Sequence, residues 1–181
     1  LFSFPISFLA ANNVTFNILN RFTKQVLNII RAFPELILAF VFLPITGLGP
    51  LTGTLAVGIH SIGTLGKLSS EVIEGIDEGP LEAIKASGGS KVSELLFGVI
   101  PQVMPTVVSY WLYRFEINLR ASAVLGVVGA GGVGAELINQ LRFRDFPRAG
   151  TVLVVTIAMV LIVDTISAAK RKRIIKGRDI K

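Results

Sequence analysis

The chain has 181 residues, of which 51% are hydrophobic and 17% are charged, whereas a typical soluble domain is about 25% charged. It has no cysteine and one histidine, His60, which excludes a disulfide framework and a zinc site built from several Cys or His ligands. Asp, Glu, Lys and Arg are absent from four long stretches, residues 36–66, 95–113, 121–135 and 149–163. A bilayer-spanning helix needs about 20 mostly apolar residues. The composition therefore argues against a soluble domain with buried strands and predicts an all-α integral membrane protein.

The formal net charge of +6 is concentrated at the C-terminal end. Residues 170–181 contain seven Lys or Arg and one Asp, and they directly follow an apolar run. Because basic residues beside a span favour the cytoplasmic side, we expect a basic cytoplasmic tail that contacts anionic membrane lipids. Nucleic-acid binding is not expected, because the tail adjoins a span and lacks interleaved aromatic residues.

The first element in chain order is residues 1–11, which look like the second half of a span, so further sequence is expected upstream. No basic segment precedes this run, so a signal peptide is not expected. Arg21, Lys24 and Arg31 follow and are expected in the cytoplasm, and Pro34 fits the first turn of the next helix. Working back from the tail, the remaining spans are expected at Pro34–Thr46, Leu51–Leu68, Val99–Leu125 and Gly150–Ala169, alternating in direction.

Two regions are not expected to cross the membrane. Residues 69–94 carry eight charged side chains, and the alternation of spans places them in the cytoplasm. Residues 126–148 begin with a glycine cluster and are expected at the outer side. Arg142, Arg144 and Arg148 in that region run against the positive-inside bias, and they would attract an anionic substrate.

The cytoplasmic loop and the start of the next span contain EAIKASGGSKVSELLFGVIP, residues 82–101. This resembles the EAA loop of ABC-importer permeases, which is roughly E-A-A, three residues, G, nine residues and I-x-L-P. The sequence departs from the pattern with Ile84 for the second Ala, Gly98 for Ile and Ile100 for Leu. The positions that carry the resemblance are Glu82, Ala83, Ile84, Gly88 and Pro101.

Further strings resemble the phosphonate-type branch of that family, and together they cover nearly all of residues 31–174. They include RAFPELILA, GLGPLTG, PQVMPTVVSYWLYRFEINLR and IVDTISAAKRKRI. The resemblance implies that residues 1–181 form one permease domain, a MetI-like type I importer helix bundle. It further implies a homodimer in the bacterial cytoplasmic membrane that imports phosphonate or a related phosphorus oxyanion delivered by an extracytoplasmic binding protein.

The resemblance also implies that the EAA loop forms a coupling helix that docks on a cytoplasmic ATPase subunit. Pro80 is suited to start that helix and Gly88 to end it at positive φ, with Glu82 in the first turn and in reach of Lys85. An ordinary solvated helix and turn is the alternative. The chain has no G-x-x-x-x-G-K-[ST] phosphate loop, so we expect no enzyme activity in it, with ATP and Mg bound by the partner ATPase. A secondary transporter or channel for a small anion remains the rival function.

Four polar residues in RFEINLR lie in the outer half of an expected span. Ionisable groups inside a membrane usually face a cavity or the bundle interior. Arg114 and Asn118 share one helix face, as do Glu116 and Arg120. These residues either line a polar path for an anion or form a buried ion-pair network, and the sequence does not decide between the two roles. Arg114 and Asn118 are the better pathway candidates, and Glu116 with Arg120 the better structural pair.

Two further pairs are candidates of the same kinds. Arg31 and Glu35 are four residues apart at the cytoplasmic entry, with Pro34 between them, and are expected to form a structural ion pair. His60 and Ser61 lie midway along an apolar run, where they either face the pathway or are packed and hydrogen-bonded.

The stretch VLGVVGAGGVGAELINQL, residues 124–141, contains G-x-G-x-x-G, the fingerprint of a dinucleotide-binding turn. A soluble dehydrogenase with that turn needs a strand before the glycines and an acid about 20 residues later. Asp145 is too near, and Asp164 lies in an apolar run. The glycines are instead expected to bend the chain at the outer end of the pathway and to let residues 135–141 return as a short helix. The glycines concerned are Gly129, Gly131, Gly132 and Gly134.

Overall fold

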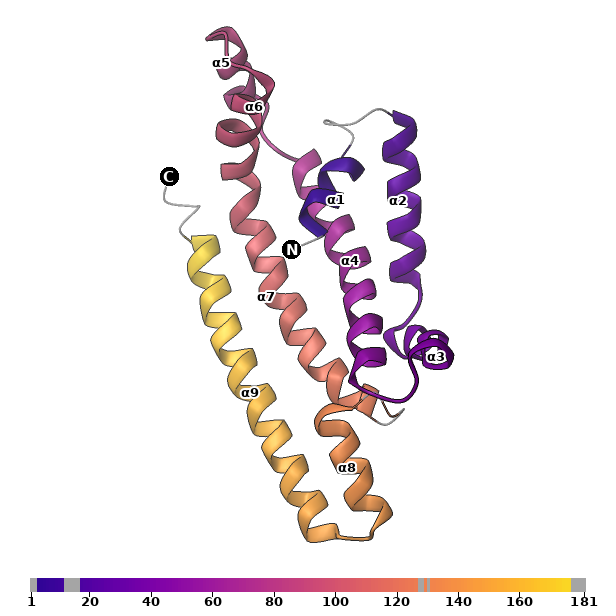
Figure 1. Cartoon of the computed structure of the whole chain (residues 1–181). Coiled ribbons are helices and arrows are strands. Elements are labelled where there is room, and N and C mark those ends of the chain that lie inside the picture. Colours follow the sequence, from indigo (N-terminus) through magenta and orange to yellow (C-terminus); the bar gives the residue numbers. More distant parts are fainter. Residues whose placement is uncertain (1–2, 12–16, 127–128, 130, 177–181) are drawn as a thin grey trace.

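The computed structural model describes residues 3–11, 17–126, 129 and 131–176, and within them the chain is helical with no strand. The all-α prediction is therefore confirmed, and Figure 1 shows the arrangement of the helices. In chain order they are α1 (Ser3–Ala10), α2 (Asn17–Ala32), α3 (Glu35–Thr46), α4 (Pro50–Glu74), α5 (Gly79–Ala86), α6 (Lys91–Ser93), the π-helix η1 (Glu94–Val99), α7 (Ile100–Leu125), α8 (Gly132–Arg142) and α9 (Phe146–Lys176).

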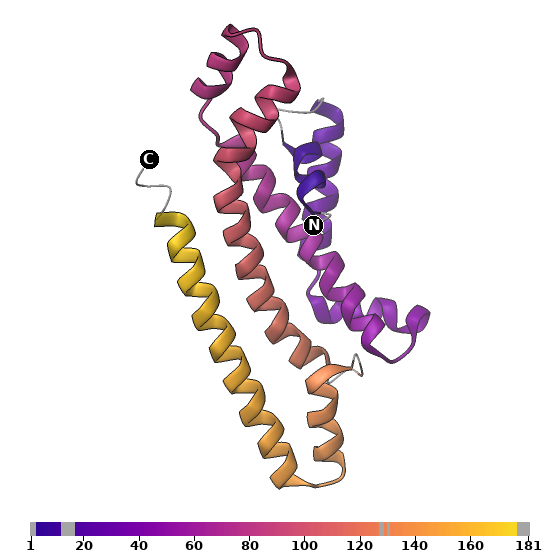
Figure 2. The same ribbon diagram turned by 60° about the vertical axis from the view of Figure 1, so that its left-hand side comes forward.

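The long helices α4, α7 and α9 run in alternating directions. α4 runs towards α5, α7 runs away from it and α9 runs back, so that α5 marks one end of the molecule and the α8–α9 junction the other (Figures 1 and 2). We call these the α5 end and the α8 end. This alternation of directions is the one expected from the sequence.

Two clusters of buried apolar side chains hold the bundle together. One joins α1, α4 and α7 near the α5 end, and the other joins α3, α4 and α7 nearer the α8 end. Phe4 of α1 packs edge-on against Trp111 of α7, with ring centroids 6.1 Å apart. The buried residues are Ala11, Ile73, Val99, Val103 and Val107 in the first cluster and Ala39, Ala56 and Leu125 in the second.

The segment before α4 differs from the expectation. We expected Pro34–Thr46 to cross the membrane alone, but α3 has 12 residues, which span only about 18 Å at 1.5 Å per residue. The 16-residue α2 runs antiparallel to α4, and α3 follows it after a 91° bend. Lys24 of α2 bonds Glu74 at the end of α4, with Nζ and Oε1 2.6 Å apart.

Small residues let α2 approach α4 closely. A Cβ on Gly63 would lie 2.7 Å from Cγ2 of Ile30, and one on Gly66 would lie 3.1 Å from Cδ2 of Leu27. Glycine at a helix contact is a common way to pack helices in lipid.

Two helices of the described residues are long and apolar enough to cross a membrane, Lys91–Leu125 and Phe146–Ile174, or three crossings if α2 and α3 together form one. The expected spans at 99–125 and 150–169 fall within the first two. α4 is 25 residues long, but its composition is not apolar enough to place it among these helices, because it carries many glycines together with His60 and Lys67. Its polar residues face other helices, as described below.

The first of these helices contains a π-helical turn, η1, between α6 and α7. The N–H of Ile100 donates to the carbonyl of Leu95, five residues back. Pro101 explains the wider turn, because its nitrogen has no hydrogen to donate and its ring would clash with the carbonyl four residues back.

Candidate functional site

Helix α5 has the boundaries that its prolyl and glycyl residues predict. Pro80 lies in its first turn, and Oδ1 of Asp77 accepts a hydrogen bond from the N–H of Gly79 at 3.0 Å. Gly88 follows the helix at φ +75°, and its N–H donates to the carbonyl of Lys85 at 3.0 Å. Both expectations, the start at Pro80 and the end at Gly88, are confirmed.

The two faces of α5 differ. Glu82 and Ala83 are exposed, and Ile84 is partly buried. A Cβ on Gly98 of η1 would lie 3.1 Å from Cδ1 of Leu81 and 3.4 Å from Cδ1 of Ile84, so α5 rests directly on η1. A larger residue at position 98 would have to displace the side chains of Leu81 and Ile84.

The charges of α5 are arranged differently from the expectation. Lys85 forms an ion pair with Glu94 of η1, with Nζ and Oε2 3.9 Å apart, rather than with Glu82. The carboxylate of Glu82 therefore stays on the outer surface of α5, and the Lys85–Glu94 pair adds a second attachment of α5 to η1.

A polar cluster lies between α3, α4 and α7. Arg114 is only 5% exposed, and its Nη2 donates to Oε1 of Glu35 at 2.6 Å, while its Nε donates to Oγ of Ser61 at 3.0 Å. Arg114 also contacts Nδ1 of His60, and Nδ2 of Asn118 donates to Oγ of Ser61 at 2.9 Å. The four residues expected near a pathway thus meet in one place, which we call the Arg114 cluster.

Glu35 belongs to this cluster and not to a pair with Arg31. Its Oε1 lies 2.6 Å from Nη2 of Arg114 and 3.0 Å from Nδ1 of His60. Arg31 is exposed at the end of α2, on the other side of the bend at Pro34, and the ion pairs of the described residues do not join it to Glu35. The guanidinium charge is therefore balanced inside the protein, where removal of one partner would leave an uncompensated buried charge.

A second set of charges joins α7 to α9. Oε1 of Glu116 bonds Nη2 of Arg120 at 2.8 Å, as the i,i+4 spacing predicts. Oε2 of Glu116 bonds Nη2 of Arg171 at 3.0 Å, and Arg120 bonds Asp164 at 3.0 Å. The Arg171 guanidinium also lies over the ring of Tyr113, 5.3 Å from its centroid. We call these residues the α7–α9 network.

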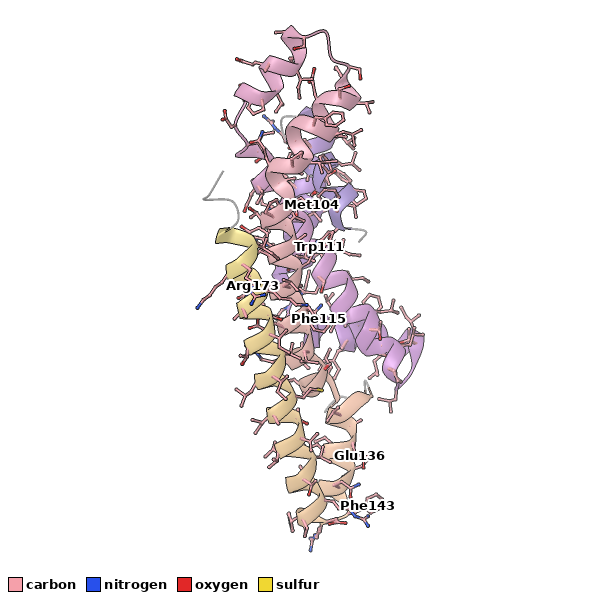
Figure 3. All side chains as sticks on the ribbon, turned by 90° about the vertical axis from the view of Figure 1, so that its left-hand side faces the viewer. Met104, Trp111, Phe115, Glu136, Phe143 and Arg173 are labelled. Carbon is pink, nitrogen blue, oxygen red and sulfur yellow. The ribbon has the colours of Figure 1, made fainter. Side chains whose placement is uncertain are left out.

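This network changes the description of the basic C-terminal segment. Residues 170–176 are the last turns of α9, and residues 177–181 lie outside the described part of the chain. Figure 3 shows Arg173 beside the middle of α7, at the level of Trp111 and Phe115, rather than beyond the bundle. The first half of the expected tail therefore packs beside α7.

The glycine motif forms a turn between two helices and not a strand–turn–helix. Gly129, Gly131 and Gly132 have φ of +76°, +78° and +75°, a region that other residues rarely adopt. At Gly134 a Cβ would lie 1.9 Å from the carbonyl oxygen of Ala123, so the backbones of α7 and α8 touch there. The short helix expected after the glycines is α8, and it does not fold back along α7. It continues beyond the end of α7 and runs beside α9 (Figures 1 and 2).

Two hollows adjoin these features. One of about 400 Å³ lies beside the Arg114 cluster, and Asn118, Ser122, Thr54 and the backbone of Gly131 are among the groups that line it. The other, of about 900 Å³, lies at the α5 end between α4, the start of α7 and the end of α9. The glycine turn and the Arg114 cluster thus face the smaller hollow together.

Gln102 is a residue that the sequence interpretation passed over. Its side-chain amide bonds the backbone of Asp77 and lies in the wall of the larger hollow. A signal was present, since Gln102 is a strongly polar residue in the charge-free run 95–113, between Pro101 and Pro105.

Comparison with known proteins gives a consistent result. A model of the family described as "Binding-protein-dependent transport system inner membrane component" matches residues 3–176. The phosphite transport system permease protein PtxC of Stutzerimonas stutzeri is 42% identical over 173 residues, 95% of this chain and 63% of that protein. The phosphate-import permease protein PhnE of Mycolicibacterium smegmatis is 42% identical over 174 residues, 96% of this chain and 33% of that protein. The chain thus spans less than two thirds of the length of these two relatives.

The fold is also found in a solved structure. A chain of the inward-facing MetNI methionine ABC transporter superposes with a TM-score of 0.75 and 20% sequence identity, covering 95% of this chain and 85% of that one. At this identity the likeness establishes the helical architecture, and the MetI-like fold expected from the sequence is confirmed.

Proposed function

Because the chain belongs to the family of binding-protein-dependent transport system inner membrane components, we propose that it is the transmembrane permease of an ATP-driven importer. The proposed substrate is phosphonate or a related phosphorus oxyanion. The two relatives named for phosphite and phosphate transport support this class of substrate, as do the sequence strings that resemble phosphonate-type permeases.

The observation that carries the proposal is the exposed face of α5. This helix is anchored to η1 on one side by Leu81 and Ile84 and offers Glu82 and Ala83 on the other. A short, firmly seated helix with a free face at the end of a bundle is suited to dock on a partner. We infer that the partner is an ATPase subunit, which binds ATP and Mg and hydrolyses the nucleotide, so that this chain couples its movement to alternating access.

The pathway is proposed to pass the Arg114 cluster and the adjacent hollow of about 400 Å³. Asn118 bridges the two, because it bonds Ser61 of the cluster and lines the hollow. A second copy of the chain would supply the opposite wall, and an extracytoplasmic binding protein would deliver the anion at the α8 end. The hydroxyl and amide groups there suit an oxyanion as hydrogen-bond donors.

The orientation follows from the same assignment. The α5 end is proposed to face the cytoplasm of a bacterium, with the chain crossing its cytoplasmic membrane several times and the C-terminal end of α9 on the cytoplasmic side. Large apolar side chains of α9 are exposed along its length, and we infer that they contact lipid and the second copy. The basic residues at the end of α9 would contact anionic lipids, and no nucleic-acid partner is proposed.

Reconstitution of the chain with its ATPase and binding protein in proteoliposomes tests the proposal. Uptake of labelled phosphonate, phosphite and phosphate is measured with and without ATP and Mg inside the vesicles. We expect uptake of at least one of these anions that requires both the nucleotide and the binding protein. Uptake that proceeds equally without ATP would contradict the proposal and would support a secondary transporter or channel for a small anion.

A further inference from the structure

Gln102 ties the connection between α4 and α5 to the start of α7. Its Oε1 accepts a hydrogen bond from the N–H of Asp77 at 3.0 Å. Its Nε2 donates to the carbonyl of Asp77 at 3.1 Å and to the carbonyl of Gly98 at 2.9 Å. The amide oxygen and nitrogen of Gln102 are therefore both bonded to the backbone of Asp77. The additional bond to Gly98 connects the same side chain to η1.

Asp77 is also the residue that fixes the start of α5, since its Oδ1 accepts from the N–H of Gly79. The connection itself is only residues 75–78, between the end of α4 at Glu74 and the start of α5. Gln102 and Asp77 thus join three elements, α4, α5 and α7, at one point.

The other attachments of α5 are less directional. Leu81 and Ile84 rest on Gly98 through apolar contacts, and the Lys85–Glu94 pair spans 3.9 Å between partly solvated groups, where such pairs contribute little. Apolar contacts resist separation but allow sliding, because the hydrophobic effect has no preferred direction. The hydrogen bonds of Gln102 have both a fixed length and a fixed direction.

We propose that Gln102 is a positioning residue for energy coupling: it makes α5 and α7 move as one body when the partner ATPase displaces α5. This inference rests on the proposed function. α7 carries Arg114 and Asn118 about three to four turns beyond Gln102. A displacement transmitted rigidly along α7 reaches the Arg114 cluster, whereas one lost by sliding at α5 does not.

The test replaces Gln102 by methionine, which has a similar length and no amide. The full chain, its ATPase and its binding protein are reconstituted in proteoliposomes, and phosphorus-anion uptake and ATP hydrolysis are measured in the same vesicles. For Gln102→Met we expect retained ATP hydrolysis and about fivefold to tenfold less anion transported per ATP, within the range of ordinary coupling changes. For Gln102→Glu, which keeps the acceptor for the Asp77 N–H but loses the donor, we expect an intermediate ratio.

Gln140→Met is the matched control. Gln140 bonds Glu136 within α8 at 2.6 Å, far along the chain from α5, so the transport ratio of this variant should equal that of the wild type. A rescue completes the design, because the chain has no cysteine. The double variant Asp77→Cys, Gln102→Cys should have a low ratio. A short bis-methanethiosulfonate reagent, which forms a disulfide with each thiol and releases methanesulfinate, should restore the ratio until a reductant cleaves the link.

The outcomes separate the inference from the function on which it rests. If the wild type couples ATP to uptake and Gln102→Met has the same transport ratio, Gln102 is not a positioning residue. If hydrolysis and uptake fall together in Gln102→Met and Gln102→Glu while the crosslink restores nothing, Gln102 serves stability only, and the inference is overturned. If the wild type itself shows no ATP-driven uptake, the proposed function fails first.

Discussion

Replacement of Gly134 by alanine tests the close approach of α7 and α8. The added Cβ would lie 1.9 Å from the carbonyl oxygen of Ala123 and 3.0 Å from Cα of Gly126, whereas carbon and oxygen normally approach to about 3.3 Å. The obstacle is backbone, so no side-chain rotation relieves it, and the two helices must part by more than 1 Å. Overpacking of this kind costs about 3 kcal/mol at the upper end of its usual range. Alanine stabilises a helix by about 1 kcal/mol relative to glycine, so the free energy of unfolding should fall by about 2 kcal/mol in total.

That loss corresponds to a melting temperature about 4–8 °C lower for a chain of this size. Thermal unfolding of the detergent-solubilised protein is followed by the fluorescence of Trp111, the single tryptophan. Gly58→Ala is the control, because Gly58 is also helical and its Cβ would meet nothing within 4 Å. We expect Gly58→Ala to melt at or slightly above the wild-type temperature. If Gly134→Ala melts as Gly58→Ala does, the backbone contact does not exist in the protein and the reasoning is wrong.

Three further substitutions test other parts of the structure. Arg114→Ala leaves the partly buried Glu35 without its guanidinium partner and should lower the free energy of unfolding by about 3 kcal/mol, the lower end of the range for buried pairs. Glu35→Ala in addition should recover part of the loss, and an unchanged free energy of chemical unfolding in Arg114→Ala would contradict the pair. Glu82→Lys reverses the charge on the exposed face of α5 and should reduce the amount of ATPase that co-purifies by about tenfold, while the chain itself stays folded. Recovery of as much ATPase as with the wild-type chain would show that Glu82 is not part of the docking surface. Gly131→Val places a β-branched residue at φ +78° with its Cβ 2.8 Å from Cγ of Pro50, where the backbone strain alone costs about 1–3 kcal/mol. We expect this variant to assemble poorly or to transport less. Normal assembly with normal uptake would show that the turn tolerates rearrangement.

Features with local causes were predictable from the sequence. The α5 boundaries follow from a proline without an N–H and a glycine that accepts positive φ, and both signals act within a few residues of the helix end. The helices α7 and α9 follow from long charge-free runs. The Glu116–Arg120 pair follows from helical spacing alone.

The packing of α2 against α4 was not predictable in the same way. α2 was interpreted as a basic cytoplasmic segment because of Arg21, Lys24 and Arg31. In the structure its polar Asn20 is fully buried and Lys24 bonds Glu74, while large apolar side chains of the helix are exposed. The inward face of this helix thus combines the polar Asn20 with the buried Leu27, while several large apolar side chains face outwards, as is expected of a helix that contacts lipid. The exposed apolar residues are Ile18, Leu19, Phe22, Val26 and Ile29.

The sequence predicted most of the residues of the candidate site, but it did not predict which of them form ion pairs. Arg114, Asn118, His60 and Ser61 were each singled out as polar groups in apolar runs, and they do meet. The missing member was Glu35, whose partner Arg114 lies 79 residues away in sequence. Spacing along one helix favoured Arg31 instead, since only the bend at Pro34 and the packing of α3 against α4 decide which cation is near.

The α7–α9 network has a mechanical consequence. Asp164 and Arg171 are seven residues apart on α9, about two helical turns, and they engage two residues of α7 that are one turn apart. A slide of α9 along α7 by one turn, about 5.4 Å, would break both contacts at once and take Asp164 and Arg171 away from these partners, which is expensive for ionisable groups within a span. The two helices are therefore held at a fixed register and form one lever, and the motion left to that lever is tilting rather than sliding.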